Sequence, residues 1–129
     1  MPIGVALDAA CGTGRHSTYL AALGHEVIGV DSSAAMLRRA HEKVPEGEFH
    51  EADLHDLPLP DDHVDLVLCA LALMHVPDLE PVLTEFVRVL RPGGSLVISD
   101  WRTLVKEMLC RWSRMAPTGA PATCRPRLA

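Results

Sequence analysis

The stretch that decides the fold is LDAACGTGR, residues 7–15. It follows a short apolar run, residues 3–7, which is bounded by glycine and consistent with a strand buried on both faces. Residues 16–23 then carry apolar side chains three and four positions apart and end before Gly24, which predicts a helix. Glycines between the strand and the helix let the backbone approach a ligand closely. The stretch therefore predicts a strand, a ligand-binding turn and a helix.

The alternation of strand and helix continues along the chain. Apolar runs predict the strands, and apolar residues at helical spacing predict the helices between them. Further strands are predicted at residues 26–30, 48–51, 64–70 and 95–99, and further helices at residues 34–43 and 79–90. Short connections and right-handed crossovers restrict such a chain to the α/β class with a doubly wound, mostly parallel sheet. In this class cofactors bind beyond the carboxyl ends of the strands.

Four sequence patterns occur in a fixed order along these elements. Residues 8–14 read Asp, two small residues and then Cys-Gly-x-Gly, and residues 27–31, VIGVD, are an apolar strand ending in an acid. Residues 52–60, ADLHDLPLP, follow the third strand, and residues 89–94, VLRPGG, turn into the fifth. Together they resemble the class I S-adenosylmethionine-dependent methyltransferases of the small-molecule, type 11-like kind.

The resemblance covers roughly residues 3–100 and implies a cofactor, a reaction and a sheet order. The cofactor is S-adenosyl-L-methionine, the reaction is methyl transfer to a small-molecule acceptor, and the Rossmann-like sheet has about five strands in the order 3-2-1-4-5. By the same resemblance Asp31 binds the ribose hydroxyls, Asp53 receives the adenine amino group and the backbone of Leu54 meets the ring. The implied cofactor-binding residues are Asp8, Cys11, Gly12, Gly14, Asp31, Ser32, Asp53, Leu54 and Ala70.

Each pattern taken singly also has a structural interpretation. The carboxylate of Asp8 could meet a cationic amino group of the cofactor or backbone amides. Asp31 could cap the helix that begins near Ser33, and residues 51–61 could be an acidic loop. An NAD-binding protein is disfavoured, because Ser17 holds the third glycine position of G-x-G-x-x-G.

His75, after the fourth predicted strand, is the candidate catalytic residue. The methyl group of the bound cofactor should point toward it, and a hydroxyl acceptor needs a base. The alternative is a histidine that is hydrogen-bonded near the next helix and shapes the cofactor pocket. Asp100 and Trp101 follow the fifth strand on the acceptor side, where helix capping is equally consistent. The other histidines have no metal-ligand spacing, so no metal site is predicted.

Charge is distributed unevenly along the chain. Residues 1–100 hold 6 Lys and Arg against 16 Asp and Glu, whereas residues 101–129 hold 6 against 1. An acidic body repels phosphate backbones, so we expect no nucleic-acid partner. No run approaches the roughly 20 apolar residues that span a bilayer, and no signal peptide is evident, which predicts a cytoplasmic protein without a membrane partner.

Both ends of the chain depart from the family pattern. The chain begins at the first strand and has 29 residues after Asp100, so we expect a truncated domain that lacks the usual last two strands. Residues 1–100 form the cofactor-binding core, residues 101–116 are predicted to be a helix, and residues 117–129 a disordered tail. The fifth strand would then be an exposed edge that favours self-association. The alternative function is a non-catalytic or decayed fragment that at most binds S-adenosylmethionine or S-adenosylhomocysteine.

Overall fold

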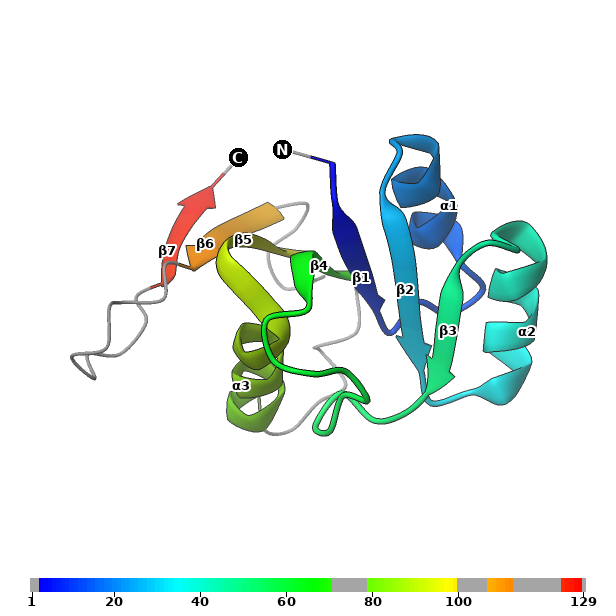
Figure 1. The fold of residues 1–129 in the computed structure, drawn as a ribbon. Coiled ribbons are helices and arrows are strands. Elements are labelled where there is room, and N and C mark those ends of the chain that lie inside the picture. Colours follow the sequence, from blue (N-terminus) through cyan, green and yellow to red (C-terminus); the bar gives the residue numbers. More distant parts are fainter. Residues whose placement is uncertain (1–2, 71–78, 100–106, 113–123, 129) are drawn as a thin grey trace.

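The computed structural model describes residues 3–70, 79–99, 107–112 and 124–128, which form one sheet with helices on both faces (Figure 1). Its elements are β1 (Val5–Ala9), α1 (Arg15–Ala22), β2 (Glu26–Asp31), α2 (Ala34–Lys43), β3 (Glu48–Glu51), β4 (Val64–Ala70), α3 (Glu80–Val89), β5 (Leu90–Ser99), β6 (Glu107–Trp112) and β7 (Cys124–Leu128). The sheet order is β3-β2-β1-β4-β5-β6-β7, and β1 to β5 pair in parallel. The predicted order 3-2-1-4-5 is confirmed.

The first strand begins and ends two residues later than its apolar run predicts. β1 continues to Ala9, which pairs with Val30 on one side and Cys69 on the other. Asp8 therefore lies inside the sheet rather than beyond the end of its strand. The described helices are 8 to 10 residues long, and none of them is long and apolar enough to cross a membrane.

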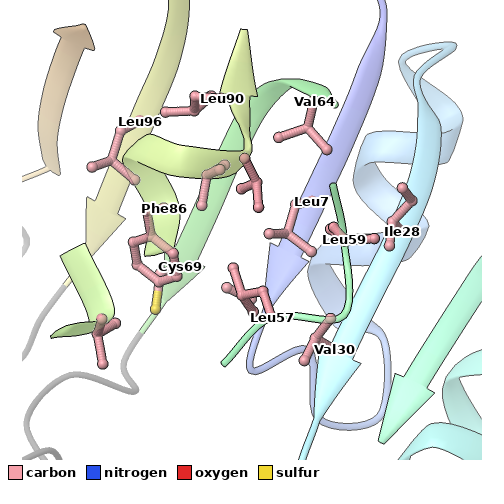
Figure 2. Packing of buried hydrophobic residues seen from close by; sticks show 14 residues of the cluster. Leu7, Ile28, Val30, Leu57, Leu59, Val64, Cys69, Phe86, Leu90 and Leu96 are labelled. Carbon is pink, nitrogen blue, oxygen red and sulfur yellow. The ribbon is translucent and has the colours of Figure 1, made fainter. Parts of the chain in front are cut away.

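The larger apolar core lies on the face of the sheet that α3 covers (Figure 2). Phe86 of α3 is fully buried against alternate residues of the central strands, because successive side chains of a strand point to opposite faces. Leu57 and Leu59 extend into the same core from the segment between β3 and β4. Burying a side chain of this size stabilises the fold by roughly 1.5–3 kcal/mol. The connecting segment is therefore part of the packed layer.

Helices α1 and α2 cover the opposite face. Ala6, Val27 and Leu66 pack there against Leu20 of α1. A smaller cluster joins α2 to the loop after β1 and to β3 through Cys11, Leu37, Ala40 and Phe49. Asp8 is two residues after Ala6, so its side chain points to this face, beneath α1.

The sheet continues beyond β5, contrary to the expectation that the last two strands are missing. β6 pairs antiparallel with β5, from Ser95 opposite Arg111 to Ser99 opposite Glu107, and β7 pairs antiparallel with β6. The helix predicted over residues 101–116 is wrong at Glu107–Trp112, and the predicted disordered tail contains β7. An unpaired β5 would leave a row of backbone N–H and C=O groups without partners, and β6 pairs them. The exposed β5 edge predicted for self-association is therefore covered.

Candidate functional site

The parallel strands bring several of the predicted site residues to one edge of the sheet. Ala9, the last residue of β1, pairs with Val30, so Asp31 lies one residue beyond it at the end of β2. Asp31 in turn pairs with Glu51 at the end of β3, and Ala70 ends β4. The loop after β1 and the turn after β3 consequently leave the sheet at the same edge, where cofactors bind in doubly wound folds.

The loop after β1 is built from left-handed backbone conformations. Ala10, Gly12 and Gly14 have φ angles of 58°, 56° and 89°. The loop is closed by hydrogen bonds from the Cys11 N–H to the Val30 carbonyl and from the Gly14 N–H to the Cys11 carbonyl, both at 3.0 Å. Among the described residues, no atom would lie within 4 Å of a Cβ added to Gly12. The space above Gly12 is therefore open to a ligand that approaches the backbone.

Asp31 ties this loop to the end of β2. Its Oδ2 accepts a hydrogen bond from the Gly12 N–H and its Oδ1 accepts one from the Ser33 N–H, each at 2.9 Å. A carboxylate has about four lone-pair positions, so two remain, among the described residues, for a ligand such as a pair of hydroxyls. The helix cap itself is Ser33, whose hydroxyl accepts from the Met36 N–H at 3.3 Å. The capping role considered for Asp31 therefore belongs to Ser33.

Asp8 lies beneath the loop and faces α1. Its side chain is 2% exposed, and its Oδ2 accepts a hydrogen bond of 2.7 Å from the hydroxyl of Ser17, which is fully buried. Burial raises the pKa of Asp8, and the hydrogen bonds from Ser17 oppose that shift. Asp8 thus joins β1 to the first turn of α1. In the sequence, Ser17 was noted only because it occupies the position of a missing glycine. The signal that could have identified its contact with Asp8 was the separation of nine residues across a strand–loop–helix unit.

Cys11 fills the space between the loop and α2. It is 6% exposed, and a Cβ on Gly29 would lie 3.1 Å from its Sγ and 2.5 Å from a ring carbon of Phe49. Burial raises the pKa of the Cys11 thiol to about 12, with further contributions from the charges of Asp8 and Asp31. A neutral thiol of this kind packs as a small apolar group.

The turn after β3 carries the second predicted carboxylate. Oδ1 of Asp53 accepts hydrogen bonds from the backbone N–H of His55, at 2.9 Å, and from the His55 ring. These bonds, the backbone one first, lower the pKa of Asp53, so its carboxylate is ionised at neutral pH. The side chain is 71% exposed. Both hydrogen bonds end on Oδ1, so within the described part of the chain Oδ2 is left to a ligand.

Of the remaining predicted site residues, three lie in the described part of the chain and three do not. Ser32 is exposed after β2, Leu54 is half-buried against the α3-side core, and Ala70 is half-buried at the end of β4. His75, Asp100 and Trp101 lie outside the described residues. The structure thus brings together the loop, Asp31 and the Asp53 turn, and it leaves the candidate base unplaced.

Comparison with known proteins agrees with this arrangement. Residues 7–98 match the family model described as a methyltransferase domain. The malonyl-[acyl-carrier protein] O-methyltransferase of Yersinia pestis is 41% identical over 95 residues, which are 74% of this chain and 36% of that protein. The demethylmenaquinone methyltransferase of Listeria welshimeri is 41% identical over 102 residues, 73% of this chain and 43% of that protein.

A solved structure shares the fold of this chain. The PH0226 protein from Pyrococcus horikoshii OT3 superposes with a TM-score of 0.71 at 38% identity, over 81% of this chain and 50% of that one. The chain spans about half or less of the length of these relatives. Since the family model covers most of its residues, the chain belongs to the methyltransferase domain family.

Proposed function

We propose that this chain binds S-adenosyl-L-methionine at the carboxyl edge of its sheet and transfers the methyl group to a small-molecule acceptor. One observation carries the proposal. Asp31 is held by two backbone N–H groups and keeps two lone-pair positions directly beside the open space above Gly12. A ribose with two adjacent hydroxyls matches that geometry, and the nearby Asp53 carboxylate matches the amino group of adenine.

The residues of this chain would mainly bind and orient. The cofactor supplies an already activated methyl group, so holding the acceptor in near-attack geometry is the protein's main contribution. Asp31 is preorganised because both of its oxygens are already oriented by N–H groups. Asp53 stays an acceptor at neutral pH because His55 holds its pKa low. Asp8 would support the loop from below, and His75 is the proposed base for a hydroxyl acceptor.

Candidate acceptors are chosen by their chemical class. Two relatives are named for malonyl-[acyl-carrier protein] and demethylmenaquinone, so both belong in a first panel with hydroxyl, carboxyl and amine compounds. A small-molecule acceptor, rather than nucleic acid, is favoured by the 16 acidic against 6 basic residues among residues 1–100.

A non-catalytic binding module is the second candidate. The chain spans only 36% and 43% of the length of the two methyltransferases, so cofactor binding and methyl transfer are tested separately. Such a module would bind the cofactor through Asp31 and the glycine loop but would not turn it over. A dinucleotide-binding protein is a weaker candidate, because Ser17 donates to Asp8 where a third glycine would be needed.

Calorimetric titration with S-adenosylhomocysteine tests the cofactor site without knowledge of the acceptor. Wild-type protein should bind with micromolar affinity, and Asp31→Ala should lose binding. Glu26→Ala is the matched control, since Glu26 is an exposed acid at the opposite end of the same strand. No binding by folded wild-type protein would overturn the proposal, and so would equal binding by the two variants.

A turnover assay distinguishes the enzyme hypothesis from the binding-module hypothesis. S-adenosylhomocysteine produced from S-adenosylmethionine is measured with each acceptor of the panel. Acceptor-dependent product supports the enzyme. Saturable cofactor binding with no product from any acceptor would leave the binding module as the function.

A further inference from the structure

An arginine on α3 holds the segment that follows the Asp53 turn. The guanidinium of Arg88 donates to the carbonyls of Leu57 at 3.0 Å and Leu59 at 2.8 Å, and to the Asp61 carboxylate at 3.0 Å. These partners lie 27 to 31 residues away in sequence. Five donors in a fixed plane suit such a multiple contact, which a lysine could not reproduce. Figure 1 shows the segment between β3 and β4 passing beside α3.

Glu85 completes the arrangement one helical turn earlier. Its two oxygens accept from the Nε and Nη2 of Arg88 at 2.8 and 2.9 Å, and its Oε2 also accepts from the Leu57 N–H at 2.7 Å. The hydrogen bond from Arg88 lowers the pKa of Glu85, and Glu85 in turn raises that of Arg88. The N–H and the C=O of Leu57 are therefore both bound by one ion pair, which we call the α3 clamp: Glu85 and Arg88.

The α3 clamp lies next to the turn that presents Asp53. The Asp56 N–H donates to the Asp53 carbonyl at 3.1 Å, and the clamped Leu57 follows immediately. On the other side of the turn, the Ala52 N–H donates to the Asp31 carbonyl at 3.0 Å. The exposed turn is thus held at both ends, by β2 before it and by the α3 clamp after it.

Side-chain packing alone would not fix the backbone conformation at the end of the turn. Leu57 and Leu59 are buried in the core, but an apolar contact is non-directional and tolerates rotation of the backbone. The clamp adds directional, charge-assisted hydrogen bonds to the backbone itself. Both Glu85 and Arg88 are largely shielded, with side chains 15% and 29% exposed.

We propose that Glu85 and Arg88 are positioning residues for adenine recognition. The α3 clamp fixes the Leu57 end of the turn, so that the free carboxylate oxygen of Asp53 and the Leu54 backbone stand where the adenine edge would lie. This inference rests on the proposed cofactor site. The discrimination of adenine from other bases would then depend on the α3 clamp through the positions of Asp53 and Leu54.

The chain offers a matched control at the other edge of the sheet. Arg91 also joins distant segments. Its Nη1 donates to Asp65 at 2.9 Å, which accepts from the Val5 N–H at 2.9 Å, and its Nε donates to the Asp62 carbonyl at 3.3 Å, at the β4 end of the connecting segment. This pair lies at the amino ends of β1, β4 and β5, away from the Asp53 turn. Arg91→Met and Arg88→Met each remove one bridging guanidinium, but only the second removes hydrogen bonds to Leu57 and Leu59, which follow the turn directly.

The experiment measures affinity for S-adenosylhomocysteine and for S-inosylhomocysteine, in which a carbonyl replaces the adenine amino group. Wild type should favour the adenosyl compound by about tenfold or more, because an unmatched polar group is costly to bind. Arg88→Met should weaken adenosyl binding by about tenfold and bring the ratio close to one. Arg91→Met should keep the wild-type ratio, and Glu85→Gln, which retains an acceptor for Leu57, should keep part of it.

Hydrogen exchange of the amides in residues 53–57 supplies a readout that needs no ligand. Arg88→Met, or Arg88→Lys if the first variant does not fold, should exchange faster there than Arg91→Met. Equal exchange, or an unchanged ligand ratio in Arg88→Met, would overturn the inference while leaving the proposed cofactor site intact. Wild-type protein that folds but binds neither compound would overturn the proposed function and the adenine role together.

Discussion

The carboxylate of Asp31 accepts the backbone N–H of Gly12 at 2.9 Å, which joins the end of β2 to the loop after β1 across 19 residues of sequence. The same carboxylate accepts the Ser33 N–H at the start of α2. One side chain thus orients both the loop after β1 and the start of α2. A single acid therefore couples local stability to the proposed ligand binding.

Replacing Asp31 should consequently lower stability as well as affinity. Asp31→Ala leaves the N–H groups of Gly12 and Ser33 without their acceptor, which should cost about 1–3 kcal/mol of unfolding free energy. Asp31→Asn keeps one acceptor oxygen and should lose less. Urea unfolding followed by circular dichroism measures both, with Glu26→Ala as the control. Identical midpoints for wild type and Asp31→Ala would contradict the coupling.

The two glycines of the loop should respond differently to alanine. Gly14 has a φ of 89°, and its added Cβ would lie 2.9 Å from the Cα of Ala40 in α2, so Gly14→Ala should destabilise by about 2–4 kcal/mol. Gly12 has a φ of 56° but open space around it, so Gly12→Ala should cost only about 1 kcal/mol. Its methyl group would instead occupy the proposed cofactor space.

Thermal unfolding and titration with S-adenosylhomocysteine separate these effects. We expect Gly12→Ala to stay folded and lose affinity, and Gly14→Ala to lose folded protein first. A Gly12→Ala variant with wild-type affinity would show that no ligand approaches the backbone there.

Asp8 should make the protein less stable as pH rises. Its pKa is raised in the folded state, so the folded protein holds this proton more tightly than the unfolded chain does. Unfolding free energy therefore falls as pH increases from the unfolded value of 3.8 to the folded value, and the loss persists above it. Asp8→Asn cannot ionise and keeps an acceptor for Ser17. It should therefore be more stable than wild type at pH 8.

The comparison is made by urea unfolding of both proteins at pH 4 and pH 8. The advantage of Asp8→Asn should be smaller at pH 4, where more of the wild-type carboxyl is protonated. Because the variant is compared with wild type at each pH, ionisation of other acids cancels. If the stability advantage of Asp8→Asn were the same at both pH values, it would not arise from ionisation of Asp8.

The Cys11 thiol should be inert toward alkylation. With a pKa of about 12, roughly one thiol in ten thousand is ionised at pH 8, and the thiolate is the reactive form. Iodoacetamide labelling followed by peptide mass spectrometry should give a rate far below that of Ala22→Cys, an exposed position at the end of α1. Comparable rates at the two positions would mean that Cys11 is more accessible than its burial indicates.

Much of the fold was predictable from the sequence because its signals are local. The bounds of α2, β3 and β4 match their predicted ranges, since apolar periodicity and turn residues act within a few positions. The sheet order also follows, because right-handed crossovers leave few alternatives for a strand–helix repeat. The positions of Asp31 and Asp53 after consecutive parallel strands are a consequence of that order.

Contacts between distant residues were decided by the tertiary structure. Strand alternation turns Asp8 toward Ser17 under α1, and in Glu107–Trp112 pairing with β5 replaces the helix that apolar spacing predicted. The α3 clamp joins Arg88 to a carbonyl 31 residues away. The sequence by itself determined the order of strands and helices and the residue types at the sheet edge, through local propensity and burial. Which polar group meets which partner depends on packing the layers together, because only the assembled fold brings the donors within hydrogen-bonding distance.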